Sequence, residues 1–529
     1  MKRRFNAILC ALGIVAIATP TILAQNEKKE KYWGRLNGGI ESNAALYKKD
    51  ENDPDAKNYG DNTYLNLRYN YKNFNAGLQY ELYLPPLKGF SQELKGHGLT
   101  HYYLNYSAEK LNVTLGSFYE QFGSGLIFRA YEERALGINN SLRGLNIKYT
   151  PSNWLTLKAM GGQPRRYMEY ADAFMWGGDA ELSAIKLFKK ESEYDVTLGA
   201  SWVSRHNTKT IEESEELARV DLFSTRAGFY SPSFNLGIEY TGKGMSQTFS
   251  PAEGSYPAEA GDALLINADY IRPNFGISGV FRRIEHMDFR IDNKLEQLYI
   301  PINYVPALTK QHKYTLPGLH PHVTELGGEI GGQVDLFWNI SGTALGKYPL
   351  KIALNASHYK SLGNNFKKTM PFFGQDGSNL FSEVALEVGK QINRSIKTTI
   401  GLYYQNKFYI SENYDSYIGV IDFLWRANRK LSLRTELQYM STEMEEKGWL
   451  FGLLEVGFAP NWMVYVSDMY NHGGEKKEHY YMAGCSFTYN GLRLTASYGR
   501  SRAGTQCVGG ICRFVPEYTG LMAGLSYTF

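Results

Sequence analysis

A two-residue periodicity, running from about residue 33 to the C-terminus, is the feature that most constrains the fold of this chain. Apolar side chains alternate with polar or charged ones in one segment after another; Leu431 and Leu433, for example, alternate with Ser432 and Arg434. Successive side chains of a β-strand point to opposite faces of the sheet, so each such segment predicts a strand with one apolar and one polar face. The sequence therefore predicts an all-β fold.

The joints between these segments alternate between short and long. The tight joints, at residues 71–73, 107–110, 150–153, 189–192, 231–233, 272–274, 391–393, 427–429, 459–461 and 489–491, are rich in Pro, Asn, Gly and Ser, as tight turns require. The long polar segments between them are 48–60, 85–97, 122–141, 163–174, 205–217, 244–261, 287–325, 361–378 and 502–517. Short turns at one end of the strands and long loops at the other are typical of a transmembrane β-barrel.

Counting the segments from a first strand at 31–47 to a last at 518–529 gives about 24 strands, within a range of 22 to 26. An even number returns the chain to its starting side, so both ends are expected on the side of the short turns. The chain after its first residues has no run of eighteen apolar residues, which excludes helical membrane spans. We predict a single antiparallel up-and-down barrel over residues 31–529, with no separate plug domain.

The N-terminus has the pattern of a secretory signal peptide. Lys2, Arg3 and Arg4 precede an apolar run at residues 7–18, which is too short to span a membrane as a helix. We predict a signal peptide at residues 1–24, a mature chain that begins at Gln25, and a short periplasmic segment at 25–30.

The C-terminal residues Leu521, Ala523, Leu525, Tyr527 and Phe529 alternate with smaller or more polar residues. This pattern resembles the last strand of Gram-negative outer-membrane barrels, which the barrel-assembly machinery recognises. The resemblance implies an integral outer-membrane protein with periplasmic termini, in contact with outer-membrane lipid and lipopolysaccharide. More narrowly, the glutamine after the predicted cleavage site, the tyrosine-rich strands and the segment at 123–132 look like an uncharacterised Bacteroidota barrel family.

The polar row of each strand is expected to face the lumen, because a charge placed against lipid near the middle of a membrane costs about 2 to 4 kcal/mol. The predicted lumen wall comprises Arg68, Glu81, Asp269, Arg282, Glu329, Asp335, Glu383, Glu387, Asp422, Arg434, Glu436, Glu455 and Arg493. Both signs are interspersed, which favours pairing between neighbouring strands over a wall selective for one ion sign; guidance of a substrate is the alternative.

A barrel this wide needs something to close it, since the known barrels of 22 strands are plugged. TonB-dependent transporters fill the lumen with an N-terminal domain, but here only about ten residues separate Gln25 from the first predicted strand. Closure must then come from inward-folded loops, from a flattened barrel or from a partner protein. The candidate loops are 122–141, with Arg129, Glu132, Glu133 and Arg134 as possible constriction or docking residues, and the apolar, proline-rich segment 287–325.

The sequence offers little catalytic chemistry. Its ten histidines are scattered, so we expect no enzyme and no cofactor. His320, His322 and Glu325 could in principle ligate a metal, and the acidic run at 50–55 could bind calcium, but ordinary polar loops are favoured in both places. Cys507 and Cys512, separated by Val-Gly-Gly-Ile, predict a small disulfide-closed loop, whereas Cys485 is expected to be an unpaired strand residue.

Two functions remain open. The first is a porin-like channel for polar solutes, restricted by inward loops. The alternative is a structural or accessory barrel in a larger outer-membrane complex for barrel assembly, protein secretion or glycan import, with other outer-membrane proteins or surface lipoproteins as partners. No nucleic-acid partner is expected, since the net charge falls from +4 to only +1 without Lys2, Arg3 and Arg4.

Overall fold

The structure is a computed structural model that describes residues 33–49, 57–189, 191–207, 218–247, 258–292, 300–342, 346–363, 372–374, 377–444 and 447–529. The predicted signal peptide at 1–24, the periplasmic segment at 25–30 and the acidic run at 50–55 lie outside these residues. The chain forms a closed antiparallel barrel of 24 strands, which confirms the predicted all-β barrel and its strand number.

The wall consists, in order, of β1 (Arg35–Tyr47), β2 (Tyr59–Tyr71), β3 (Phe74–Tyr83), β4 (Gly96–Ser107), β5 (Leu111–Phe118), β10 (Leu142–Ser152), β11 (Leu155–Arg166), β13 (Ala173–Ser183), β14 (Asp195–Asn207), β15 (Arg219–Tyr230), β16 (Phe234–Gln247), β17 (Ala258–Arg272), β18 (Phe275–Glu285), β19 (Gly328–Ile340), β20 (Leu350–Ser361), β21 (Asn379–Gln391), β22 (Ile396–Tyr409), β23 (Glu412–Arg426), β24 (Leu431–Thr442), β25 (Gly448–Phe458), β26 (Trp462–Asn471), β27 (Glu478–Tyr489), β28 (Leu492–Ser501) and β31 (Tyr518–Thr528). Short elements within the joints are η1 (Gln92–Leu94), β6 (Gln121–Phe122), β7 (Phe128–Arg129), β8 (Glu132–Glu133), β9 (Ile138–Asn139), β12 (Glu169–Tyr170), α3 (Ala184–Phe188), β29 (Gly504–Val508) and β30 (Ile511–Val515).

The last strand closes the barrel by pairing with the first. β31 pairs with β1 from Gly39 opposite Thr528 to Tyr47 opposite Gly520. Beyond this ladder, the amide of Gly38 donates to the carbonyl of Phe529 over 3.0 Å, and the amide of Phe529 donates to the carbonyl of Gly38 over 2.9 Å. No edge of the 24-strand wall is therefore left unpaired.

Apolar side chains cover the outside of the wall. Leu437 is 63% exposed, Leu402 57% and Ile421 53%, whereas their inward-facing neighbours Val420 and Gln438 are buried. The tryptophans at strand ends, among them Trp338, Trp425 and Trp462, are also exposed. An exterior of this kind is stable against hydrocarbon and not against water.

The joints depart from the predicted pattern in places. Much of the expected loop at 163–174 is strand, because β11 extends to Arg166 and β13 begins at Ala173. Three joints on the long-loop side, at 410–411, 443–447 and 472–477, are short, so this rim is low along β22–β27. No helix among the described residues is long and apolar enough to cross a membrane.

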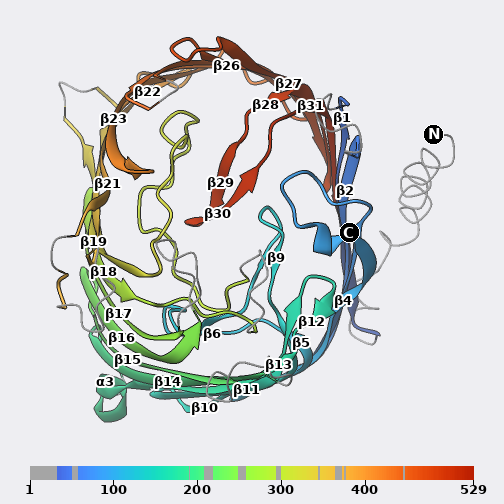
Figure 1. Cartoon of the computed structure of the whole chain (residues 1–529), viewed down its shortest axis with the longest axis vertical. Helices are drawn as coiled ribbons and strands as arrows, with labels where there is room; N and C mark the ends of the chain where they lie inside the picture. The colour runs from blue at the N-terminus through green and yellow to red at the C-terminus, as the bar shows by residue number, and fades with distance from the viewer. Residues whose placement is uncertain are drawn as a thin grey trace.

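Several joints fold into the barrel instead of extending outward (Figure 1), and three of them are the longest. We call residues 119–141 the Gly-rich loop, residues 286–292 together with 300–327 the long loop, and residues 502–517, which contain β29 and β30, the disulfide hairpin. Apolar residues of the loops and the wall form cores inside the barrel: Phe128 and Ile302 pack with Met175 on one side, and Leu316 packs with the wall of β21–β26 on the other. Burial of this apolar surface holds the loops inside.

Candidate functional site

The Gly-rich loop and the long loop bind each other through their backbones. The amide of Arg129 donates to the carbonyl of Ile302 over 2.7 Å, and the amide of Tyr304 donates to the carbonyl of Gly125 over 2.9 Å. The guanidinium of Arg129 lies 3.7 Å from the ring centroid of Tyr304. Arg129, a predicted constriction residue, thus joins two loops.

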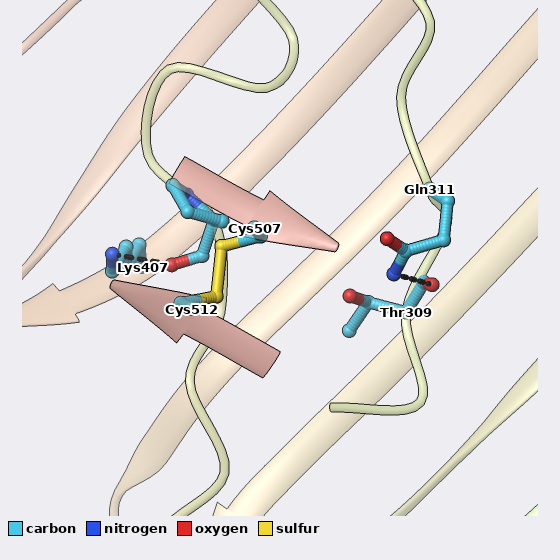
Figure 2. Close-up of a disulfide and its surroundings, with 6 residues drawn as sticks. Thr309, Gln311, Lys407, Cys507 and Cys512 are labelled. Atoms are coloured by element: carbon cyan, nitrogen blue, oxygen red, sulfur yellow. Dashed lines mark hydrogen bonds between the residues drawn. A yellow bond between two sulfur atoms is a disulfide. The ribbon is translucent and has the colours of Figure 1, made fainter. Parts of the chain in front are cut away.

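The disulfide hairpin reaches the same place from the other end of the chain. Cys507 and Cys512 are joined by a disulfide between β29 and β30, as Figure 2 shows. At the hairpin tip, the Tyr304 hydroxyl donates to the carbonyl of Gly509 over 2.8 Å, and the amide of Ala307 donates to the carbonyl of Gly510 over 3.3 Å. A Cβ at Gly510 would meet the carbonyl oxygen of Ala307 at 2.7 Å, so this close contact needs glycine.

Arg513 links the hairpin to the Gly-rich loop. Its Nε donates to the carbonyl of Ala135 over 2.9 Å, and its guanidinium lies 3.9 Å from the ring centroid of Phe90 in the loop before β4. We call the three connected loops, namely the Gly-rich loop, the long loop and the disulfide hairpin, the loop assembly.

The other predicted constriction residues fix the Gly-rich loop to the wall. The guanidinium of Arg134 lies 2.9 Å from the Glu41 carboxylate of β1 and 3.2 Å from the Glu132 carboxylate. Burial acts to lower the pKa of Arg134, but these two carboxylates outweigh it and raise the pKa above its ordinary value. Glu133 accepts a hydrogen bond from the amide of Ala135 over 3.1 Å and so serves the local turn.

Two predicted wall acids form buried ion pairs on the lumen side. Glu81 accepts two hydrogen bonds of 2.7 Å from Arg165, and both side chains are almost fully buried. Glu329 lies 2.7 Å from the guanidinium of Arg282 and 2.8 Å from Nε2 of His322 in the long loop. The pairs satisfy charges that burial would otherwise penalise.

Three further wall acids contact residues 312–314 of the long loop. Glu383 lies 2.7 Å from Nε2 of His312, and Glu387 lies 3.0 Å from Nζ of Lys313. Asp422 accepts a hydrogen bond from the Tyr314 hydroxyl over 3.2 Å. These wall acids therefore act as anchors of the loop assembly.

The remaining predicted wall residues are not loop anchors. Arg434 pairs with Asp422 and with Glu436 within the wall. Asp269 accepts a hydrogen bond from Ser278 of the next strand, and Asp335 accepts one from Asn355 over 2.6 Å. Glu455 lies opposite Arg434 in the register of β24 and β25. Among the described residues, Arg68 and Arg493 are exposed to the lumen and make no ion pair.

The loops cover the inner wall unevenly. Inward side chains such as Met160, Met175 and Val203 are buried beneath the loops, and so are Val420 and Met440 opposite them. In contrast, most inward residues of β27, β28 and β31 stay partly exposed from the turn side to the loop side, including Met482, Thr495, Ser497, Gly524 and Ser526. We call this part of the wall the water-accessible sector.

Sequence reasoning missed several anchors. Arg165 lies in a segment predicted as a polar loop, so its partnership with Glu81 across 84 residues was not foreseen. Gln405 donates to the carbonyl of Pro317 over 2.8 Å, and Lys407, which Figure 2 labels, donates to that of Pro321 over 2.7 Å. Their place in the polar row of β22 was the one signal available.

His320, His322 and Glu325, the possible metal ligands of the sequence analysis, lie in the long loop. The ring of His322 stacks on Tyr359 and Phe381 while its Nε2 contacts Glu329. Burial, aided by the positive charges of Lys407 and Arg502, lowers the pKa of His320 to about 3, so this ring is neutral. No group of three His, Cys, Asp or Glu side chains in the described part of the chain is arranged to hold a metal ion.

The chain is similar to several solved structures that are distant in sequence. The translocation pore of the P pilus usher PapC has a TM-score of 0.45 and 10% identity, and the match covers 93% of this chain and 99% of that one. The siderophore receptor PirA from Pseudomonas aeruginosa has a TM-score of 0.41 and 10% identity, covering 94% and 80%. The copper transporter OprC has a TM-score of 0.41 and 7% identity, covering 94% and 81%.

The sequence matches no curated protein. One family model matches it, that of DUF6029, which is described as a family of unknown function, over residues 1–529. Because this match spans the whole sequence, the chain belongs to the family DUF6029.

Proposed function

We propose that this protein is a passive outer-membrane channel for small polar solutes, narrowed by its own loop assembly. The observation that carries the proposal is the uneven covering of the lumen: the loop assembly buries the wall on two sides, but the inward residues of β27, β28 and β31 keep contact with water over most of their height. A polar path along one sector of a wide barrel suits diffusion of polar solutes.

The topology follows from the same proposal. The short turns and both termini face the periplasm, and the loop assembly enters the lumen from the outer surface. The loops take the place of a separate plug domain. The C-terminal pattern ending at Phe529 and the segment at 123–132 support a Bacteroidota outer membrane as its location.

Conductance of the purified, refolded barrel in planar bilayers tests this proposal. We expect steady single-channel steps, because the water-accessible sector is always present. Reversal of two unpaired lumen charges, Arg68→Glu with Arg493→Glu, should shift the reversal potential in a KCl gradient toward cation preference, since both side chains are exposed to the lumen. Arg429→Glu, in an exposed turn between β23 and β24, is the matched control and should leave it nearly unchanged.

A correctly folded barrel that never conducts would contradict the channel and favour the alternative, an accessory barrel in a larger complex. That alternative is supported by the large amount of folded loop inside the lumen. A channel for small solutes does not need so much folded structure in its path. Purification in mild detergent at native abundance would then show stable partner proteins.

A further inference from the structure

A groove lies on the outside of the wall, away from the loop assembly. It has a volume of about 690 Å³ and crosses β22–β27, below the low rim where the joints are short. Its apolar lining includes Ile400, Leu402, Ile421, Leu437 and Leu450, all of which point outward. The groove therefore opens to the surface that faces hydrocarbon and not to the lumen.

Two outward-facing glycines form the floor of the groove. Gly419 on β23 lies beside Leu402 and Tyr439 in the strand register, and Gly452 on β25 lies beside Leu437. A Cβ at Gly419 would meet no atom within 4 Å, and one at Gly452 would meet only Leu437, at 3.9 Å. The hollow thus results from two absent side chains, which makes it narrow: a helix, about 10 Å across, does not fit such a gap, whereas an extended hydrocarbon chain does.

The loop-side end of the groove is polar, which is unusual on this face. Asp468 shares its outward direction with Val464 and Val466, and its Oδ2 lies 2.6 Å from Nδ1 of His479. The His479 ring stacks on Tyr470 with a centroid distance of 4.2 Å. Polar groups on a lipid-facing wall are costly near the membrane middle, but here they lie at the level of the tyrosines near the strand ends.

The Asp468 carboxylate is accessible at this end of the groove. The side chain of Asp468 is 43% exposed and that of His479 is 56% exposed, so a ligand in the groove can reach both. A carboxylate on a lipid-facing wall costs free energy unless a cation or a hydrogen-bond donor meets it. The groove and the cluster together match an amphiphile: a chain for the apolar floor and a head group with donors for the carboxylate.

We infer that this groove binds one bilayer lipid, with an acyl chain over Gly419 and Gly452 and a head group carrying amine or hydroxyl donors against Asp468. The head group donates to the Asp468 carboxylate, whose side chain is 43% exposed, while the chain replaces contacts that the missing side chains would have made. This site is independent of the lumen, so it stands or falls separately from the proposed channel.

Native mass spectrometry of the barrel, extracted after reconstitution into vesicles with equal amounts of phosphatidylethanolamine and phosphatidylcholine, tests the inference. The wild type should retain one lipid through delipidation and should prefer phosphatidylethanolamine, whose ammonium can donate. Gly419→Leu with Gly452→Leu fills the floor and should abolish retention. Gly279→Leu is the matched control, because Gly279 also has open space around its Cβ position but lies on β18, outside the groove.

Asp468→Asn gives a second, milder variant in case the leucines impair folding. It should retain a lipid and lose the preference for phosphatidylethanolamine over phosphatidylcholine. Equal retention by the wild type and the filled variant would overturn the inference, and so would a wild-type dimer that the filled variant converts to monomer, because a second copy would then occupy the groove.

Discussion

The side chains of Glu81 and Arg165 form a buried ion pair that stabilises the barrel wall. Two hydrogen bonds of 2.7 Å join them, and Thr100 donates a third, also of 2.7 Å, to the same carboxylate. The pair connects β3 to the loop-side end of β11. It therefore joins the first and last of five consecutive wall strands, namely β3, β4, β5, β10 and β11.

Removing one partner should be costly, because the other charge stays buried. Arg165→Met is expected to lower the free energy of unfolding by about 3 to 5 kcal/mol. The double variant Arg165→Met with Glu81→Leu should recover much of this loss, because neither charge remains. Denaturant titration of the refolded barrel, followed by intrinsic fluorescence, measures both effects.

Arg500→Met provides the comparison for that titration. Arg500 pairs with Glu478 and Glu517 in a more exposed position, so its loss should cost about 1 kcal/mol or less. Equal effects of Arg165→Met and Arg500→Met on the free energy of unfolding would show that losing a partner of the buried pair costs no more than losing a partner of an exposed one.

Among the elements, the disulfide hairpin contacts the long loop inside the lumen and restrains it there. Its tip carbonyls at Gly509 and Gly510 accept hydrogen bonds from the long loop, and Arg513 fixes the hairpin to the Gly-rich loop. A hairpin closed by a covalent bond presents these carbonyls with less loss of conformational entropy.

Opening the disulfide should therefore loosen the loop assembly and leave the wall intact. Cys507→Ser with Cys512→Ser removes a closure worth about 2 kcal/mol for so small a ring. We expect faster trypsin cleavage at Lys310 and Lys313 of the long loop, together with larger or noisier conductance. Cys485→Ser, in β27, is the control and should change neither. Unchanged cleavage in the double variant would mean that the hairpin does not restrain the long loop.

At the scale of the whole molecule, closure depends on the meeting of the first and last strands. Phe529 exchanges two backbone hydrogen bonds with Gly38, and its ring occupies the space beside that glycine: a Cβ there would collide with Cζ of Phe529. The terminal residue is thus part of the seam as well as part of the C-terminal pattern.

Deletion of Phe529 should reduce the yield of closed barrel, because it removes both hydrogen bonds and the ring contact. Gly38→Val should act in the same direction by displacing the ring. The fraction that migrates as the compact form in unheated gels measures closure. Gly98→Val, at a glycine with open space around its Cβ position, should fold normally; a normal yield from both seam variants would show that the β1–β31 ladder closes the barrel unaided.

The strands of the wall could be predicted from the order of residues alone, because the side chains of a strand alternate between its two faces and its turns use a small set of residue types. That local information was enough for the 24 strands and for the inward direction of Glu81, Glu329 and Glu383. It also predicted which segments are too apolar to remain in water, such as 287–325.

The partners of those inward residues could not be predicted in this way. Glu81 meets Arg165 and Glu383 meets His312 because the closed barrel brings strands and loops together that lie far apart in the chain. The groove over Gly419 and Gly452 likewise exists only when β23 and β25 are placed side by side with β24. Periodicity is a local property, whereas pairing across a lumen and hollows in a wall depend on distances that are set only when the barrel closes.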